Sequence, residues 1–397
     1  MKNEKLLLFI LAIIQFTHIM DFMIVMPLGK QFMEIFAINP QQFSLIVSSY
    51  ALSAFLSGIL GAVFIDRLDR KKVLLFLYCG FATGTLACAS SNSYFFFLIS
   101  RCISGMFGGL LSAIVLSIIG DVFPYERRSS AIGIIMTAFS VASVVGVPSG
   151  IYLAAKFTWR MPFIIIGSLS ILFIILAFFI IPSLQAHLKS GKGETNPFKI
   201  LGNILQDKNQ VKALVFGLIL TLGHFSIIPF IAPYMQLNIG FSDFQVSYIY
   251  FAGGLFTAVL LPIFGRLADR FGNALVFSIA SFFALFSIFA ITNLPPVSIF
   301  VALCVSSSYF IVSSGRSVPA LSMVTAVVRP ESRGSFMSIR GSMNQLALGV
   351  GSLVAGLIVK EQADHSLINY QYVGYFAIVM SIVAVGLALQ LKVAKGG

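Results

Sequence analysis

The sequence predicts an all-α integral membrane protein whose twelve transmembrane helices form two pseudo-symmetric six-helix bundles. Three observations carry this prediction: an apolar composition, about twelve long apolar segments, and charged markers that recur half a chain later. Of the 397 residues, 58% are hydrophobic and only 10% are charged. Because a soluble domain cannot bury that much apolar surface, lipid has to be the solvent for most of the chain.

Each apolar segment approaches the length of about 20 residues that a helix needs to cross a bilayer. The first one follows two lysines, as in a signal peptide, but it continues to Pro27 without a small-residue cleavage site, so we expect it to be retained. In chain order the expected spans are 6–28, 43–65, 73–92, 95–120, 131–154, 161–182, 212–233, 245–266, 274–293, 297–323, 336–359 and 370–391.

The net charge of +12 is distributed unequally between the two sides that these spans define. If both termini are cytoplasmic, the cytoplasmic loops hold most of the lysines and arginines, and the opposite side holds only Lys30, Lys156, Arg160 and Lys360. Cytoplasmic loops of membrane proteins carry such an excess of basic residues. We therefore expect a multi-pass protein of the inner (cytoplasmic) membrane with both termini in the cytoplasm. The basic charge is explained by this orientation, so we expect no nucleic-acid partner.

Charged markers recur at an offset of about 205 residues. A turn motif at 61–72 returns at 265–272, and Glu126-Arg127-Arg128 after the fourth span returns as Glu331-Ser332-Arg333 after the tenth. His18 in the first span corresponds to His224 in the seventh. Duplicated carriers are built from such repeats. The expected domains are a bundle at 1–182, a cytoplasmic linker at 183–211 and a second bundle at 212–397.

The linker is the longest polar stretch of the chain, with glycines and lysines between Ser190 and Pro197 that favour a flexible segment. Residues 197–207 could form a short amphipathic helix on the membrane surface. The linker has no phosphate-binding loop, and no other segment offers a nucleotide site, so transport would use an ion gradient. We expect no cofactor and no metal site, since the four cysteines lie in apolar spans without ligand spacing.

Ionisable groups inside a membrane cost about 3 kcal/mol each, so the few present are candidates for function. Asp21 is the one acidic residue deep in any span, and Gln15, His18 and Asp21 share a helix face. Asp21 and Arg101 lie at similar depths, which predicts an ion pair that couples transport to protons, with His18 as a possible relay. The alternative is a static pair that only holds two helices together.

The second half contributes further polar positions that we expect to bind substrate. The expected substrate-binding residues are Gln15 and His18 in the first half and His224, Tyr309, Arg316, Arg340 and Asn344 in the second. Each histidine could equally be a packing residue, and Arg340 could extend to the cytoplasmic rim. Three deep arginines against one aspartate favour anionic or neutral polar substrates over lipophilic cations.

At these loops and spans the chain resembles the major facilitator superfamily, and within it the twelve-span drug:proton antiporter branch. The loop signature of the family matches Gly265–Gly272, whereas in the first copy Ala62 and Asp69 replace its two glycines. The fourth-span signature Arg-x-x-x-Gly matches Arg101 and Gly105. The Gly- and Pro-rich kink of the fifth span resembles the kink that antiporters carry, at Gly146, Pro148 and Gly150.

The resemblance implies a cytoplasmic gate in which Arg70 reaches Asp121 and acidic groups of the loops face helix ends of the other half. Its expected members are Asp66, Arg67, Arg70, Asp121, Asp269 and Arg270. Asp69 lies beside Asp66 among the basic residues, so we expect a denser charge cluster in the first loop. The alternative is that these charges only set topology and cap a turn.

The function that these features favour is a secondary active transporter without catalytic residues, which exports a small organic molecule such as a drug, sugar or metabolite in exchange for protons. A symporter or importer of a polar or anionic metabolite, a lysolipid translocator on the same fold, and a non-transporting sensor or scaffold are the alternatives. A membrane enzyme would need clustered metal ligands or an activated nucleophile, and the sequence has neither. We expect a monomer in the lipid bilayer.

Overall fold

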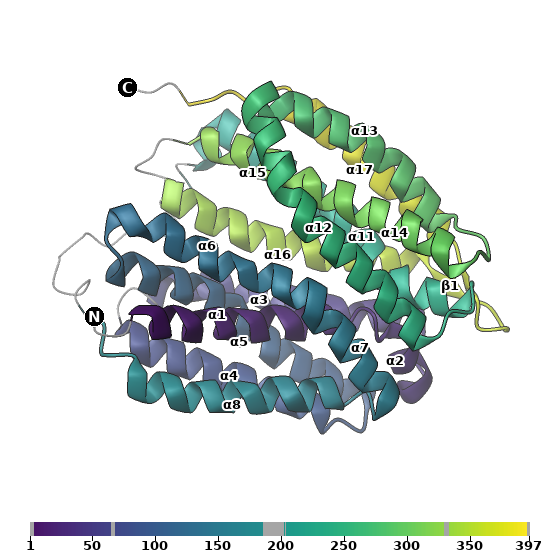
Figure 1. The fold of residues 1–397 in the computed structure, drawn as a ribbon, viewed down its shortest axis with the longest axis horizontal. Helices are drawn as coiled ribbons and strands as arrows, with labels where there is room; N and C mark the ends of the chain where they lie inside the picture. Colours follow the sequence, from purple (N-terminus) through teal and green to yellow (C-terminus); the bar gives the residue numbers. More distant parts are fainter. Residues whose placement is uncertain (1–3, 65–67, 186–201, 203, 329–332, 395–397) are drawn as a thin grey trace. The chain divides into compact units, whose positions relative to one another are not determined.

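The computed structural model describes residues 4–64, 68–185, 202, 204–328 and 333–394, and these residues are mostly helical (Figure 1). Among them, twelve helical spans are long and apolar enough to cross a membrane. The first six spans and a short extra helix are built from α1 (Glu4–Ile24), α2 (Gly29–Phe36), α3 (Pro40–Phe64), α4 (Arg70–Ala89), α5 (Tyr94–Val122), α6 (Tyr125–Val141), the π-helical turn η2 (Ala142–Gly146), α7 (Val147–Lys156) and α8 (Met161–Ile180).

The other six spans follow the linker, of which Gly202 and Ile204–Gln206 are described as helical. Two strands form an antiparallel hairpin between the last two spans, with Lys360 opposite Ile368 and Glu361 opposite Leu367. The elements are α11 (Lys208–Leu237), α12 (Asp243–Phe271), α13 (Asn273–Thr292), α14 (Ile299–Gly315), α15 (Ser317–Ala326), α16 (Arg333–Ile358), β1 (Lys360–Glu361), β2 (Leu367–Ile368) and α17 (Tyr370–Ala388).

Several of the long helices begin at side chains that bind otherwise unpaired backbone N–H groups. Ser93 accepts a hydrogen bond from the N–H of Phe96 at the start of α5, and Asp207 accepts from Asn209 and Gln210 at the start of α11. Ser242 and Gln245 form a reciprocal capping box before α12. Polar residues at the ends of the apolar runs therefore set where these spans start.

Two details were not expected from the sequence. The first span ends at Ile24 rather than at residue 28, and a turn leads into the separate helix α2. Ala37, in the left-handed conformation with φ of 50°, ends α2. The second detail is the hairpin between α16 and α17. Its two-residue strands are too short to show the alternation of apolar and polar residues that predicts a strand.

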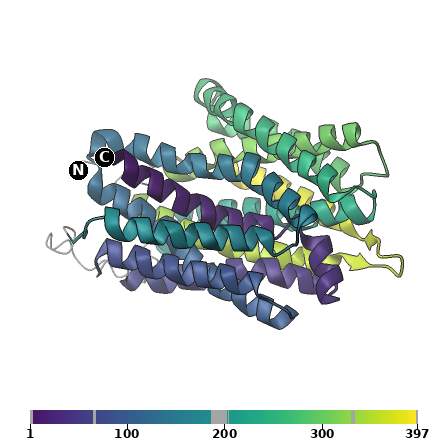
Figure 2. The same ribbon diagram turned by 60° about the horizontal axis from the view of Figure 1, so that its bottom comes forward.

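The chain divides into two compact units: residues 1–25 with 49–197, and residues 26–48 with 198–397. The first unit is built around α4, which packs against α5 and α8, and α1 packs against α6 and α8 (Figure 2). A buried hydrogen bond of 2.9 Å between the hydroxyls of Thr17 and Tyr78 joins α1 to α4. The division at 182 and 212 that the repeats indicate remains a prediction.

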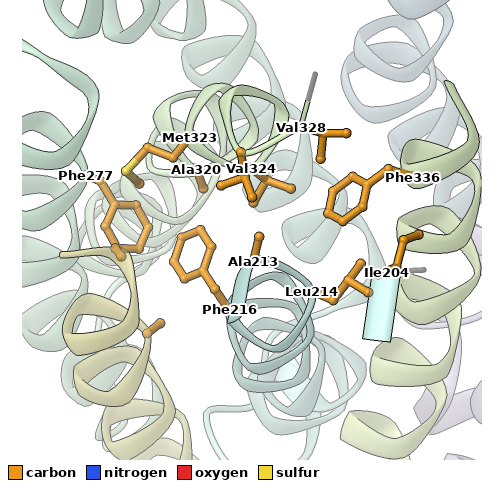
Figure 3. Close-up of a cluster of buried hydrophobic side chains, with 13 residues drawn as sticks. Ile204, Ala213, Leu214, Phe216, Phe277, Ala320, Met323, Val324, Val328 and Phe336 are labelled. Atoms are coloured by element: carbon orange, nitrogen blue, oxygen red, sulfur yellow. The ribbon is translucent and has the colours of Figure 1, made fainter. Parts of the chain in front are cut away.

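The second unit is built around α11, which packs against α16 and α17. One end of α11 lies in a cluster of buried side chains drawn from five spans and the end of the linker (Figure 3). Phe216 of α11 and Phe277 of α13 meet there edge to face, with ring centroids 5.2 Å apart. Ile204 is buried in the same cluster, so the end of the linker is anchored to this unit.

Residues 26–48 belong to the second unit although the sequence assigns them to the first bundle. Gly29 of α2 faces the side chains of Phe43 and Pro233. Gln31 donates a hydrogen bond of 3.1 Å to Asp243 at the start of α12, and the ring of Phe43 meets that of Phe230 edge to face. The segment between the first two spans is therefore packed on α11 and α12.

Candidate functional site

The charged centre of the first unit is an ion pair between α1 and α5. Nη1 of Arg101 lies 2.6 Å from Oδ2 of Asp21, and both side chains have no solvent-exposed surface. The same Nη1 donates to the backbone carbonyl of Asp21, and the hydroxyl of Thr85 in α4 donates to Oδ1 at 3.0 Å. The carboxylate is thus held from two helices. The structure brings together the pair that the sequence predicts.

Tyr50 of α3 covers this ion pair. The guanidinium carbon of Arg101 lies 4.5 Å from the centroid of the Tyr50 ring, which is the geometry of a cation–π contact. A Cβ atom at Gly105, one turn along α5, would collide with the backbone of Tyr50. The Arg-x-x-x-Gly spacing therefore has a physical basis: the glycine lets α3 approach closely enough for Tyr50 to reach the arginine.

Two other side chains of α1 face the same interior. Gln15 exchanges hydrogen bonds with the hydroxyl of Ser112 in α5, at 2.8 and 3.2 Å. His18 is buried, and neither of its ring nitrogens has a hydrogen-bond partner among the described residues. Its ring lies near those of Tyr50 and Phe81. Among these neighbours His18 contacts no carboxylate. Its position is therefore explained equally well by packing and by a role as a proton relay.

The fifth span changes its helical hydrogen bonding at the Gly- and Pro-rich segment. The N–H of Val147 bonds to the carbonyl of Ala142, five residues back, and Pro148 follows directly. Such π turns often mark functional sites. Cβ atoms at Gly146 and Gly150 would meet Met20 and Ile24 of α1, respectively. The kink therefore lies against the helix that carries Asp21.

The second unit holds a buried arginine at the break between α14 and α15. Arg316 is 1% exposed, and its Nη1 donates a hydrogen bond of 2.9 Å to the hydroxyl of Ser381 in α17. The break follows from Pro319, which lacks the N–H that would bond to the carbonyl of Gly315. Among the described residues, Arg316 makes no ion pair.

Tyr309 and His224 lie beside this arginine. The Tyr309 hydroxyl is 3.3 Å from Nδ1 of His224, and the two rings are stacked. Both groups are within electrostatic range of Arg316. His18 lies in the first unit and His224 in the second, and each has its own set of neighbours.

The two polar side chains predicted on the eleventh span have different surroundings. Asn344 accepts a short hydrogen bond of 2.5 Å from the hydroxyl of Thr221 on α11. Arg340 is partly buried, and its Nε has no partner among the described residues. Asn344 therefore joins α16 to α11, and Arg340 adds a second positive charge to this unit.

The predicted gate is described only in part. Nε of Arg70 lies 3.2 Å from Oδ2 of Asp121, so the structure brings these two residues together across α4 and α5. Asp66 and Arg67 lie outside the described residues. Asp269 and Arg270 are exposed at the end of α12, and within the described part of the chain neither forms an ion pair.

Asp69 differs from our expectation of a denser charge cluster. Its carboxylate caps α4 through the N–H of Lys71 and accepts hydrogen bonds from Ser183, Leu184 and Gln185. Burial raises the pKa of Asp69, but these four hydrogen bonds outweigh it and lower the pKa from 3.8 to about 2. Within the described residues, Asp69 attaches the start of the linker to α4 and pairs with no cation.

Comparison with known proteins identifies the family. The profile of the Major Facilitator Superfamily matches residues 11–315 and 213–395. The chain belongs to the Major Facilitator Superfamily. It is therefore a multi-pass membrane transporter that acts on small molecules, and not an enzyme.

Relatives and solved structures agree with this assignment. The uncharacterized MFS-type transporter YtbD of Bacillus subtilis (strain 168) is 26% identical over 354 residues, which cover 86% of this chain and 85% of that protein. A bacterial homolog of the human lysosomal transporter Spinster, in an inward-facing and occupied conformation, has a TM-score of 0.79 at 16% identity, covering 98% of this chain and 97% of that chain. A D-xylose-proton symporter has a TM-score of 0.74 at 16% identity, covering 95% and 96%. The predicted fold class is confirmed.

Several residues of the two charged centres were missed by sequence reasoning. Thr85 and Tyr50 contact the Asp21–Arg101 pair, and Ser381 binds Arg316. Hydroxyl-bearing residues are common in apolar spans, where they can bond to their own helix, as Ser381 also does to Ala377. No sequence signal separates those that reach a neighbouring helix from those that do not.

The contact at Gly105 predicts a steric effect on stability. Replacing Gly105 with Ala should lower the stability of the folded protein by about 1–3 kcal/mol, because the new methyl group meets backbone atoms of Tyr50. Gly120→Ala on the same helix is the matched control, since nothing lies within 4 Å of its added Cβ. Thermal unfolding in detergent measures both. Equal midpoints for the two variants would contradict the close approach of α3 and α5.

The hydrogen bonds of Asp69 predict a second, pH-dependent effect. Asp69→Ala should cost about 0.5–2 kcal/mol at neutral pH, as lost helix caps do. Because the pKa is lowered in the folded state, this stabilisation is present above the ordinary value of 3.8 and disappears as the pH falls toward 2. Unfolding midpoints of wild type and variant should therefore converge in acid. A gap that stayed constant from pH 7 to pH 2 would contradict this role of the carboxylate.

Proposed function

We propose that this protein exports a small organic molecule across the inner membrane of a cell in exchange for protons. Two six-helix bundles would rock around a central site and expose it alternately to each side, with both termini in the cytoplasm. The resemblance to the drug:proton antiporter branch supports exchange, and the π turn at Ala142–Gly146 coincides with the kink expected of antiporters. The observation that carries the proposal is the buried ion pair of Asp21 and Arg101.

The pair offers a means of coupling protons to movement. Breaking a buried ion pair by removing one partner costs about 3–5 kcal/mol, because the other charge is left uncompensated. A proton that neutralises Asp21 removes most of the attraction that holds Arg101. The Tyr50 ring still offers the guanidinium a contact of about 0.5–2 kcal/mol. The protonation state of Asp21 would therefore decide how firmly α1 and α5 are joined.

Other polar residues would complete the cycle. Substrate would contact Gln15, His18, His224, Tyr309, Arg316, Arg340 and Asn344, all of which lie on helices of the two units. The Arg70–Asp121 ion pair joins the cytoplasmic ends of α4 and α5 in the proposed orientation. Together with Asp66, Arg67, Asp269 and Arg270, it would hold the cytoplasmic gate shut until substrate or a proton binds.

Arg316, whose charge has no carboxylate partner among the described residues, favours an anionic substrate, and for an anion a second function has to be considered. An importer that carries an anionic metabolite together with a proton would move no net charge for a monoanion. Export of the same anion in exchange for one proton would move two charges. The free energy of each charge is about 2.3 kcal/mol per 100 mV of membrane potential. The two functions therefore differ in their dependence on voltage.

The experiment that separates them uses proteoliposomes with an imposed pH gradient, a pH-sensitive dye and a potential clamped by potassium and valinomycin. Sugars, phenicols, organic anions and cationic drugs are added in turn. Exchange predicts proton movement opposite to that of the substrate, and symport predicts movement in the same direction. For an anionic substrate, only exchange should respond steeply to the clamped potential. Absence of proton movement with every class would contradict both functions.

The proposed coupling predicts the effect of removing the carboxylate. Asp21→Asn should abolish transport driven by the pH gradient, because the side chain can no longer take up and release a proton. Arg101 then loses its buried partner, so the double variant Asp21→Asn with Arg101→Gln removes both charges and tests whether folding is the cause. Uptake in vesicles and gel filtration are measured for both.

Glu34→Gln is the matched control, since it removes an exposed carboxylate from α2 and should leave transport unchanged. Both Asp21 variants are expected to remain folded and inactive in uphill transport. Undiminished uphill transport by either of them would overturn the role of this ion pair in coupling.

A further inference from the structure

The second unit carries a buried positive charge that no acidic side chain contacts among the described residues. The described acidic residues of this unit are Glu34, Asp207, Asp243, Asp269, Glu361 and Asp364, and none of them bonds to Arg316. Arg316 is buried between α14, α15 and α17, and its one hydrogen bond among the described residues goes to a neutral hydroxyl. Arg101 in the first unit, by contrast, touches Asp21.

If Arg316 only held helices together, the free-energy cost of burying its charge would bring no gain over a neutral side chain. Each charge at the centre of a membrane helix costs about 3 kcal/mol on insertion scales, and a neutral side chain could donate to Ser381 equally well. Most N–H groups of Arg316 have no acceptor among the described residues. The fixed fork of an arginine matches a planar carboxylate with two parallel hydrogen bonds. The missing partner of this site is therefore an oxyanion.

The charge of the ligand follows from the charge of the site. Arg316 by itself neutralises one negative charge, whereas a phosphate dianion would leave a second charge in a region of low dielectric unless Arg340 on α16 also reached it. A second positive charge on His224 would be repelled by the guanidinium of Arg316, which lies within electrostatic range. A single carboxylate or another monoanionic group fits these constraints better than a dianion or a cation.

Neighbouring side chains extend the site along one face of α14. Tyr309 and Ser313 precede Arg316 by seven and three residues, so they lie about 10 and 5 Å before it on the same face. Ser306, one turn further, has a buried hydroxyl without a partner among the described residues. An aromatic ring and hydroxyls along this face can contact the uncharged part of a small molecule.

We infer that Arg316 is the anchor of a binding site for monoanionic organic molecules, with Tyr309 and His224 beside it. This inference rests on the proposed function only in taking the protein to be a transporter of small molecules, and it holds for exchange and for symport. It assigns the two tasks to different units: Asp21 and Arg101 would handle the proton, and Arg316 would hold the substrate. The substrate class is then an organic carboxylate.

The test compares four probes of nearly equal size with purified wild-type protein in detergent at pH 8. They are benzoate, benzamide, phenyltrimethylammonium and phenyl phosphate, and binding is measured by thermal stabilisation over a concentration series. Benzoate should bind at least about 10-fold more tightly than the neutral amide and the cation. Phenyl phosphate, a dianion at this pH, should bind more weakly than benzoate.

Variants then assign the preference to the arginine. Arg316→Gln should abolish the advantage of benzoate over benzamide, and Arg316→Lys, which keeps the charge but not the fork, should retain part of it. Arg160→Gln is the charge-matched control from outside the spans, where Arg160 bonds to Ser91 and Asn92. Gel filtration checks that each variant is folded. If Arg316→Gln does not fold, the preference for benzoate is compared between Arg316→Lys and wild type instead.

The outcomes separate this inference from the proposed coupling. If benzoate binds through Arg316 but moves no protons in vesicles, proton coupling fails and the anion site stands. If protons move with cations or neutral compounds while benzoate neither binds nor competes, the anion site fails and coupling stands. No binding of benzoate, or an equal preference in wild type and Arg316→Gln, overturns the inference.

Discussion

Asp21 and Arg101 form an ion pair whose side chains have no solvent-exposed surface, and the packing of the first unit is organised around it. In so low a dielectric, either charge without the other costs about 3–5 kcal/mol, so the pair favours the packing of α1, α3, α4 and α5 around it. Thr85 supplies a hydrogen bond, Tyr50 covers the guanidinium, and Gly105 provides the space for Tyr50. The π turn of the fifth span packs against the same helix α1. A change in the charge of one carboxylate would therefore reach every span of this group.

The second unit has related elements but a different charge balance. His224 occupies the place that His18 has in the sequence repeat, and Tyr309 stacks on it, but no acidic group accompanies Arg316. Both halves carry polar residues on helices that correspond in the sequence repeat, but the two sets differ in charge. A balanced pair suits a group that exchanges protons, whereas an unbalanced arginine suits a ligand that supplies the opposite charge. This difference between the halves is the physical basis for assigning them different tasks.

The two loop motifs have diverged in the same way. The second copy keeps the glycines of the family pattern, and its Asp269 and Arg270 are exposed. In the first copy, Asp69 replaces a glycine, and its carboxylate caps α4 while binding the start of the linker. The residue that departs from the family pattern is thus the one that attaches the linker to α4. The Arg70–Asp121 ion pair lies beside it, so the end of the first unit is held by charge and by hydrogen bonds together.

The sequence by itself determined the twelve spans, the duplication, the family, and the rare charges that belong inside the membrane, because hydrophobic length and the cost of buried charge are local properties of the chain. Depth along two helices also sufficed to match Asp21 with Arg101. Only the tertiary structure decided which neutral side chains complete each centre: Tyr50, Thr85 and Ser381 lie far from their partners in sequence and carry no distinguishing pattern. It likewise decided the role of Asp69, since a carboxylate among cations can pair with them or accept hydrogen bonds, and that choice depends on which backbone groups the fold brings near.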